Sequence, residues 1–431
     1  MEFENTVDLN ATPDLHLNFR CDYGFNGEIT YLDETGAAHT VNLSTLAELE
    51  TTDFTAGTYD LYLDFASYVE QQGHLPTDGI VKLTRVTYYV VGVKDSYARL
   101  YDLSFCAAKA VPEISLSYPT VSFEDMVCCN IYYTVTEADQ IAEMGILLFD
   151  SLLENGTYGD ATEVSSGYER SGDLLVVRTG GIAAKKMGDD LYFRVYAKLT
   201  DGSYVYSKAY RYNIITYAKG ILGGNNSAQM KALVVAALNY GAQAQQYFGY
   251  RTDSLMNSSL TAQQLALVEA YRSDMINKVV PVDATKAGVF TNSGGFTRRY
   301  PTVSFEGAFS INYYFVPGSA PDGAVRLYYW TQEAYNAATI LTADNCSGTV
   351  TTTVNENGEY YAVVEGIAAK DLDGTVYVTA VYESGSTTHC TGVLAYSIGA
   401  YCGSQAAGTA MQDFAAATAV YSYYAKQYFA A

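Results

Sequence analysis

Hydrophobic and polar residues alternate in short runs along the first 110 residues of the chain. Six runs bounded by Gly, Asp or Asn have the period of two that is typical of half-buried β-strands, at 15–21, 28–33, 40–43, 59–65, 80–91 and 98–106. In the run at 59–65, Tyr62 and Asp64 alternate with apolar residues, so both are predicted on a solvent-facing side. Short, evenly spaced strands joined by polar loops predict an all-β sandwich over residues 1–110.

The rest of the chain contains two copies of one module. Three segments recur in the same order: YPTVSFE at 118–124 and 300–306, GIAAK at 181–185 and 366–370, and AQQYF at 244–248 with AKQYF at 425–429. Matches that keep their order along the chain indicate an internal repeat. We therefore predict a first domain at 1–110, copy 1 at 111–280 and copy 2 at 281–431.

Each copy begins with strand-like runs and ends with helical ones. The strand-like runs are 127–135, 144–149, 174–177, 191–199 and 204–212 in copy 1, and 310–316, 325–330, 360–364 and 376–381 in copy 2. Apolar residues then recur at helical spacing over 230–248 and 411–429, after shorter helices that end at Gly223-Gly224 and Gly403. The predicted fold class is mainly β with α+β repeats. It consists of an N-terminal β-sandwich followed by two tandem β-sandwich-plus-helical-hairpin modules, whose helices cover one face or edge of the sheet.

Charge and composition exclude some classes of binding partner and indicate a location for the protein. The net charge is −22, which argues against nucleic acid and anionic membrane surfaces as partners. No run of 18 apolar residues occurs, so no membrane insertion is expected. The chain opens Met1-Glu2-Phe3 without the basic and then apolar start of a signal peptide, which fits a cytosolic protein or a mature fragment. Few Lys and abundant Tyr, Thr, Ser and Gly favour the fragment, and hence an extracellular or cell-surface location.

Motifs that carry chemistry are missing from the sequence. Seven cysteines show no CxxC spacing, and four histidines form no HExxH pair. Cys21 and Cys106 lie near the two ends of the first domain, where a bridge could join its terminal strands. Asp371-x-Asp373-Gly374 matches only part of a calcium loop, and a plain turn is favoured. No cofactor is expected, structural calcium is compatible with so acidic a chain, and a non-enzyme is predicted. Glutamates 124 and 306 hold equivalent places in the copies, which favours a structural role.

Two resemblances support this picture. The two copies resemble uncharacterised tandem modules of large secreted and cell-surface proteins of gut and rumen clostridia. The segments that carry it are GIAAKKM at 181–187, Tyr217-Ala218 before a helix, and LNYGAQAQQYFGY at 238–250, whose Gly-Tyr end is missing after Phe429. Such modules sit beside leucine-rich repeats, immunoglobulin-like domains and carbohydrate modules, and no catalytic residue carries over. Residues 1–110 are similar to jelly-roll carbohydrate-binding modules, on Gly57 to Phe65 and the runs 83–92 and 98–105.

Tyrosine carries the functional hypothesis. The chain has 41 Tyr, 17 Phe and one Trp. A tyrosine combines an apolar ring with a polar tip, which suits both half-wet strands and the apolar face and hydroxyls of a sugar. The candidate ligand-binding residues are Tyr23, Tyr31, Tyr62, Asp64, Tyr89, Tyr97 and Trp330. The predicted function is a non-catalytic adhesin-type protein that binds glycan or host glycoprotein. A structural stalk or filament repeat is the alternative, and a glycoside-active enzyme comes third because paired carboxylates leave no motif.

Overall fold

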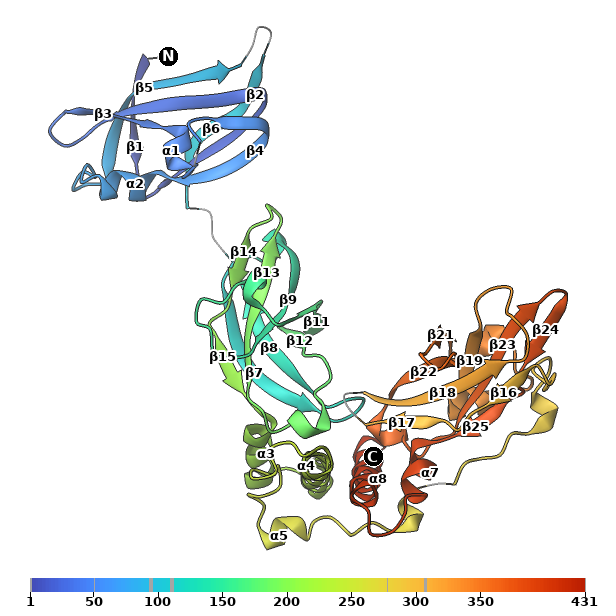
Figure 1. Ribbon diagram of the computed structural model, residues 1–431. Coiled ribbons are helices and arrows are strands. Elements are labelled where there is room, and N and C mark those ends of the chain that lie inside the picture. Colours follow the sequence, from blue (N-terminus) through green and yellow to red (C-terminus); the bar gives the residue numbers. More distant parts are fainter. Residues whose placement is uncertain are drawn as a thin grey trace. The chain divides into compact units, whose positions relative to one another are not determined.

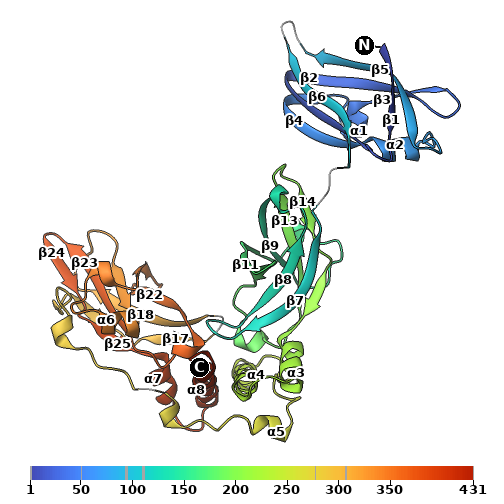
Figure 2. The ribbon, with the colours of Figure 1, turned by 180° about the vertical axis from the view of Figure 1, so that it is seen from behind.

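The chain divides into two compact units, Met1–Val111 and Pro112–Ala431. The computed structural model describes residues 2–49, 51–92, 96–108, 112–276, 278–305 and 308–430. Figures 1 and 2 show both units from two sides. The first unit corresponds to the predicted first domain, whereas both sequence copies lie in the second unit.

The described residues of the first unit form a six-stranded sheet with short helices at its rim. Its elements are β1 (Glu2–Asp8), β2 (Asp14–Leu32), β3 (Ala38–Asn42), α1 (Leu43–Leu46), β4 (Phe54–Asp64), α2 (Phe65–Gln71), β5 (Ile80–Val91) and β6 (Ala98–Cys106). β2 is the centre of the sheet. Its first half pairs with β4 and β6, and its second half pairs with β5 and β3, all antiparallel.

The bend in β2 closes this sheet over one core. A register shift between Cys21 and Gly24 marks a bulge, which bends and twists the strand. Phe19 before the bulge and Phe25 after it stack at 4.2 Å between ring centroids, so both halves of β2 face the same core. The mainly-β, sandwich-like class is confirmed. A jelly roll has two sheets, whereas the two layers here are halves of one sheet that share β2.

Copy 1 is a sandwich of two antiparallel sheets. Its strands are β7 (Ile114–Ser122), β8 (Cys128–Val135), β9 (Ile141–Phe149), β10 (Glu163–Ser166), β11 (Glu169–Ser171), β12 (Leu174–Arg178), β13 (Leu191–Leu199), β14 (Tyr204–Tyr206) and β15 (Tyr210–Tyr212). β11, β12, β8 and β7 form one sheet, and β10, β9, β13, β14 and β15 form the other. The helices that follow are α3 (Ile214–Gly223), α4 (Ala228–Phe248) and α5 (Ala262–Leu265).

Copy 2 repeats this order of strands and helices. Its elements are β16 (Phe296–Arg298), β17 (Thr302–Ser304), β18 (Phe309–Pro317), β19 (Arg326–Trp330), α6 (Gln332–Ala337), β20 (Gly348–Thr351), β21 (Thr353–Val354), β22 (Tyr360–Ile367), β23 (Val376–Ser384), β24 (Thr387–Cys390), β25 (Leu394–Tyr396), α7 (Ile398–Gly403) and α8 (Ala410–Phe429). β16 and β17 together correspond to β7, and α8 corresponds to α4. The predicted helices at 230–248 and 411–429 are confirmed. They close one end of each sandwich and do not cover a face or an edge (Figure 1).

The two copies interlock through their helices. The hydroxyl of Tyr240 in α4 donates to the carbonyl of Phe305 in copy 2, at 3.1 Å. The hydroxyl of Tyr421 in α8 donates to the carbonyl of Phe123 in copy 1, also at 3.1 Å. The two tyrosine rings stack on each other at 5.2 Å. Each copy therefore docks its YPTVSFE segment onto the long helix of the other, and one hydrophobic core runs through both.

A second pair of repeated segments meets at the same interface. Lys370, from the GIAAK segment of copy 2, lies 2.5 Å from the carboxylate of Glu124, from the YPTVSFE segment of copy 1. The backbone N–H of Ala369 donates to the carbonyl of Glu124 at 3.1 Å. This contact explains the structural role predicted for Glu124. The equivalent residue 306 lies outside the described residues.

The suggested bridge between Cys21 and Cys106 is wrong. Cys21 pairs with Ala98 at one end of β6, whereas Cys106 pairs with Asp14 at the other end. At roughly 3.3 Å per residue, seven residues of β2 keep the two apart by more than 20 Å, far beyond disulfide reach. Within the described ranges all seven cysteines are free thiols.

Candidate functional site

The outer face of the first half of β2 carries a polar cluster that sequence reasoning found only in part. Leu15, Leu17 and Phe19 point into the core. The residues between them therefore point outward, as strand alternation requires. On this outer face His16 lies between Tyr62 of β4 and Ser104 of β6, and Asn18 lies between Asp60 and Asp102. We call His16, Asn18, Asp60, Tyr62 and Asp102 the His16 patch.

His16 joins the two flanking strands. Its Nε2 lies 2.6 Å from Oδ1 of Asp60, and its Nδ1 lies 2.7 Å from Oδ2 of Asp102. The amide of Asn18 also donates to Asp60 at 3.3 Å, and the hydroxyl of Ser104 donates to Asp102 at 2.8 Å. Carboxylates only accept hydrogen bonds. Both ring nitrogens therefore act as donors, which is the protonated form of histidine.

The electrostatics agree with that geometry. Asp60 raises the pKa of His16 through its hydrogen bond, against the opposing effect of burial, and Asp102 adds to the rise. The Ser104 hydroxyl, followed by His16, lowers the pKa of Asp102. An opposite charge or a hydrogen bond to the charged form stabilises that form. The patch is therefore an imidazolium held between two carboxylates.

Tyr62 supplies the aromatic surface of the patch. Its ring stacks on the imidazole of His16, with 4.6 Å between centroids and 23° between planes. Its side chain is 40% exposed, so part of the ring faces solvent. A flat ring with carboxylates and an amide beside it offers both an apolar contact and fixed hydrogen-bonding groups. The patch is chemically suited to hold a polar ligand with an apolar face.

Asp64, the neighbour of Tyr62 in the prediction, has a structural contact. It is the N-cap residue of α2, and its carboxylate accepts a hydrogen bond from the N–H of Ser67 at 2.9 Å. Such caps satisfy an otherwise unpaired N–H at the helix start. Asp64 remains exposed at the strand end, two residues from Tyr62. The structure thus places it beside the patch, held by the helix.

Tyr23, Tyr89 and Tyr97 form a separate group near the bulge in β2. All three are exposed. The N–H of Tyr97 donates to Asp22 at 2.8 Å, and Tyr89 pairs with Asn26 of β2. Seven to ten residues of β2, with the bulge among them, separate this group from His16 in the strand register. The predicted ligand residues of the first unit therefore do not form one site.

Two predicted ligand residues are buried, and the prediction that they contact a ligand is corrected. Tyr31 is 1% exposed, and its hydroxyl reaches Nδ1 of His74 at 3.0 Å inside the first unit. Trp330 is 0% exposed, and its indole N–H donates to Asn345 at 2.9 Å. Strand alternation could not show this, because the covering residues come from distant segments. Both rings stabilise a core.

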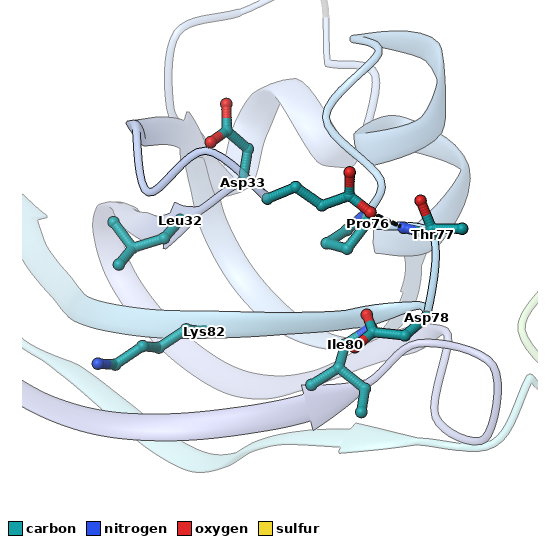
Figure 3. Close-up of a pocket in the computed structure, with 8 residues that line it drawn as sticks. Leu32, Asp33, Pro76, Thr77, Asp78, Ile80 and Lys82 are labelled. Carbon is teal, nitrogen blue, oxygen red and sulfur yellow. Dashed lines mark hydrogen bonds between the residues drawn. The ribbon is translucent and has the colours of Figure 1, made fainter.

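A shallow cleft of about 380 Å³ lies between the end of β2 and the start of β5 in the first unit (Figure 3). Asp33, Pro76, Asp78 and Lys82 line it, and the N–H of Thr77 donates to the Glu34 carboxylate. His39 and then Thr35 lower the pKa of Asp33 through hydrogen bonds. The carboxylates of this cleft are thus occupied by bonds within its own loops, and its lining lacks an aromatic ring.

Within the described ranges, no three His, Cys, Asp or Glu side chains are placed to hold one metal ion. No described helix is both long enough and apolar enough to cross a membrane.

Comparisons with known proteins give remote likeness only. No family model and no curated protein matches the chain. Among solved structures, the glycoside hydrolase domain of Endo-D from Streptococcus pneumoniae R6 is 13% identical, with a TM-score of 0.20, over 49% of this chain and 30% of that one. A β-1,2-glucanase from Parabacteroides distasonis is 11% identical, with a TM-score of 0.16, over 54% and 36%. The chain thus spans about a third of the length of these two proteins.

A third structure is a tetra-tandem repeat in the extending region of a large adhesion protein. It is 13% identical, with a TM-score of 0.17, over 92% of this chain and 70% of that one. The neighbours therefore include a tandem repeat of an adhesion protein as well as a glycoside hydrolase domain and a glucanase. At these TM-scores neither likeness decides between functions.

Proposed function

We propose that this protein is a non-catalytic, extracellular surface protein of the adhesion type, and that its first unit binds a glycan, free or on a host glycoprotein, through the His16 patch. The observation that carries the proposal is the exposed Tyr62 ring stacked on His16 between two carboxylates. All members of the patch lie on strands of one sheet, so their spacing is fixed before a ligand arrives, which reduces the entropic cost of binding.

The chemistry of a sugar fits this arrangement. One side of a pyranose ring presents C–H groups that pack on an aromatic face, and its hydroxyls donate to carboxylates and exchange hydrogen bonds with amides. Tyr62 supplies the face, and Asp60, Asp102 and Asn18 supply the polar groups. The protonated His16 holds both carboxylates in place and offsets part of their charge, which favours a neutral or weakly charged ligand.

A glycan array probed with the full chain, with and without calcium, tests the proposal. We expect selective signal, and for the best glycan at least a tenfold loss of affinity in Tyr62→Ala. Tyr62→Phe keeps the ring and is expected to stay within about threefold. Tyr300→Ala is the matched control, since Tyr300 lies in the second unit and is 94% exposed. A blank array, or a Tyr62→Ala variant that binds like the control, would overturn the assignment to this patch.

The pH dependence of binding gives an independent readout. The pKa of His16 is raised, so its ion pairs are complete below about pH 6.5, the ordinary value for histidine. They are lost as the pH rises through the higher value in the folded protein. Glycan affinity is therefore expected to fall between neutral and alkaline pH. His16→Gln removes the titrating group and is expected to bind weakly with a flat profile. A wild-type profile that matches this variant would contradict the role of His16.

The non-catalytic part of the proposal has its own test. Asp60 and Asp102 are two carboxylates on one face, and pairs of carboxylates are the groups that glycosidases use. Here both are engaged with His16, and neither is buried in an apolar pocket of the kind that raises the pKa of a catalytic acid. We expect no turnover on a panel of chromogenic glycosides. Turnover that is lost in Asp60→Asn would make the protein an enzyme.

The second unit favours a second role, as a rigid spacer. Its two copies share one core and exchange tyrosine hydrogen bonds, which makes them a single body and not two flexible beads. A stalk that holds a binding unit away from a surface needs such stiffness. Light scattering over a range of concentrations tests the filament version. Concentration-dependent growth is expected for a filament, and a strict monomer would leave only the spacer version.

A further inference from the structure

A cleft of about 850 Å³ lies in copy 1, between the end of β9 and the start of β13. Its lining comes from residues 148–192 and 250–251 of copy 1. Its lining includes the aromatic residues Phe149 and Tyr192 and the acidic residues Asp189 and Asp190, and we call the two acidic residues its polar wall. The cleft is in the second unit, so it is separate from the His16 patch.

The polar wall is held in place by ion pairs. Asp189 accepts hydrogen bonds from the hydroxyl of Tyr250 and from Nη1 of Arg251, both at 2.6 Å. Asp190 lies 2.7 Å from Nη2 of Arg211. Arg251 adopts a left-handed backbone conformation, with φ of 46°, which is uncommon for a residue with a side chain. The turn after α4 thus places the Arg251 guanidinium beside Asp189.

Strand register shows which part of copy 2 corresponds to the cleft. In copy 1, Tyr192 of β13 pairs with Phe149 of β9. In copy 2, Tyr377 of β23 pairs with Trp330 of β19. Tyr192 therefore corresponds to Tyr377, and Phe149 to Trp330. Two positions earlier, directly before the start of each strand, Asp190 corresponds to Thr375.

In copy 2 this position is covered by the protein's own chain. The residues 278–290, which we call the strap, pass along the outer side of copy 2 before β16 (Figure 1). The N–H of Val280 donates to Oγ1 of Thr375 at 2.9 Å. The carbonyl of the same residue accepts from the hydroxyl of Tyr377 at 3.2 Å. The backbone N–H and carbonyl of Val280 are thus held by a hydroxyl acceptor and a tyrosine donor, and a short 3-10 helix follows at Ala284–Lys286.

Further along, the strap is held by aromatic contacts. The N–H of Asp283 donates to the hydroxyl of Tyr335 at 2.7 Å, and that ring stacks on Tyr377 with 3.5 Å between centroids. Phe290 packs on Trp330 at 5.6 Å. Phe290, Trp330, Tyr335 and Tyr377 all belong to one small buried cluster. The strap therefore contacts copy 2 as a bound peptide would, although it belongs to the same chain.

Copy 1 keeps one residue that holds the strap, Tyr192 for Tyr377, and its described part has neither a counterpart of α6 nor a strap. The chain before β7 is the last strand of the first unit, β6, and only residues 107–113 separate the two. In copy 2, residues 278–295 are available for the same purpose. Asp190 stands where Thr375 accepts from the strap, and it accepts hydrogen bonds from the amide of Asn213, at 2.8 Å, and from Tyr192, which stands in the place of Tyr377. None of the described residues that line the cleft comes from a strap-like segment.

We propose that the cleft of copy 1 binds an extended segment of a partner polypeptide, in the way that copy 2 binds its own strap. A backbone N–H of that segment replaces the Tyr192 hydroxyl as a donor to the Asp190 carboxylate, and the freed hydroxyl donates to a neighbouring carbonyl of the segment. The segment is rich in β-branched residues and proline, like Val279-Val280-Pro281-Val282 of the strap. These residues favour an extended backbone.

The test uses a labelled synthetic peptide with the sequence of residues 278–290 and measures its binding to the full chain by fluorescence anisotropy. The strap of copy 2 has a high effective concentration because it is attached, so the free peptide is expected on copy 1. We expect saturable binding that a scrambled peptide does not show. Tyr192→Phe is expected to weaken binding about fivefold, as one lost neutral hydrogen bond predicts. Asp190→Ala is expected to weaken it more than tenfold.

The equivalent residues of copy 2 supply the controls. Tyr377→Phe and Thr375→Ala make the same chemical changes outside the cleft, and the affinity for the peptide is expected to stay unchanged. A photo-crosslinker at the position of Val280 is expected to label residues 148–192. No binding at millimolar peptide, equal binding of the scrambled peptide, or crosslinks on Thr375 and Tyr377 would each overturn the proposal. Circular dichroism of each variant separates lost binding from lost folding.

Discussion

The two copies of the second unit share their strand order and their helices but differ in what covers their outer faces. In copy 2, Trp330 and Tyr377 are fully buried under the strap and α6. In copy 1, the corresponding face carries a smaller cluster of Leu147, Phe149 and Tyr196, and leaves the cleft beside Tyr192. The same fold thus has a fully covered outer face in copy 2, which we call the sealed face, and an outer face with a cleft in copy 1, which we call the open face.

The difference shows which parts of a repeat are free to diverge. YPTVSFE is identical in the two copies, and each copy uses it to contact the long helix of the other. A substitution in this segment therefore alters one of the two equivalent contacts between the copies. The outer faces meet only their own flanking segments. The corresponding core residues of the two copies can therefore differ, as Phe149 and Trp330 do, because a different neighbouring segment covers each of them.

The largest expected effect comes from removing the two corresponding aromatic residues. Trp330→Ala deletes a fully buried ring, and Phe149→Ala deletes a ring in a smaller cluster. Large-to-small changes of buried aromatic residues cost about 3–5 kcal/mol. We expect about 4–5 kcal/mol for Trp330→Ala and about 3 kcal/mol for Phe149→Ala, measured by urea unfolding followed by circular dichroism. A larger loss in copy 1 would contradict the view that the strap adds packing to copy 2.

The next effect comes from loosening the strap without removing its receptor. Phe290→Ala is expected to cost about 3 kcal/mol and to open copy 2 locally. Trp330 is the only tryptophan, so its emission reports on this contact alone. We expect a red shift and stronger quenching by iodide in the variant. Val289→Ala is the matched control, because its side chain is 80% exposed. Unchanged emission in Phe290→Ala would mean that other residues seal the site.

Local patterns predicted most strands because their alternation is local. β5, β6 and β13 have the expected bounds. β2 was expected as two strands, 15–21 and 28–33, because Gly, Asp and Asn residues were expected to bound each run. In the structure residues 21–24 form a bulge, and the strand stays paired with β4 on both sides of it, Cys21 with Gly57 and Gly24 with Thr55. Turn-forming residues thus allow a bend without ending the strand.

The site was less predictable because it depends on distant partners. Tyr62 was named from its alternation in β4, but His16 was missed. Its partners Asp60 and Asp102 lie 44 and 86 positions away along the chain. Trp330 and Tyr31 were misjudged for the related reason that an aromatic residue on a strand gives no sign of what covers it. Only register between strands, which a single sequence does not supply, would have brought His16 and its two carboxylates together.

A smaller effect tests the symmetry of the shared interface. Tyr240→Phe and Tyr421→Phe each remove one hydroxyl and leave a buried carbonyl, of Phe305 or Phe123, without its donor. Each is expected to cost about 1–2 kcal/mol, and the two losses are expected to agree within about 0.5 kcal/mol. The rings stack on each other, so the double variant is not expected to be additive. Tyr300→Phe is the control. Unequal losses would show that the interface depends mainly on one copy.

The smallest effect comes from the ion pair that joins the repeated segments. Glu124 raises the pKa of Lys370, so the contribution of this lysine is complete below its ordinary pKa of about 10.4 and is lost only as the pH rises through the higher folded value. Both side chains are partly exposed, and such pairs contribute about 0.2–1 kcal/mol. Glu124→Gln is expected to cost about 0.5 kcal/mol in urea unfolding at pH 7, and less in high salt. A loss above about 2 kcal/mol would mean that charge, and not the stacked tyrosines, holds the copies together. The difference between the sealed and open faces would then matter less for stability than this polar interface.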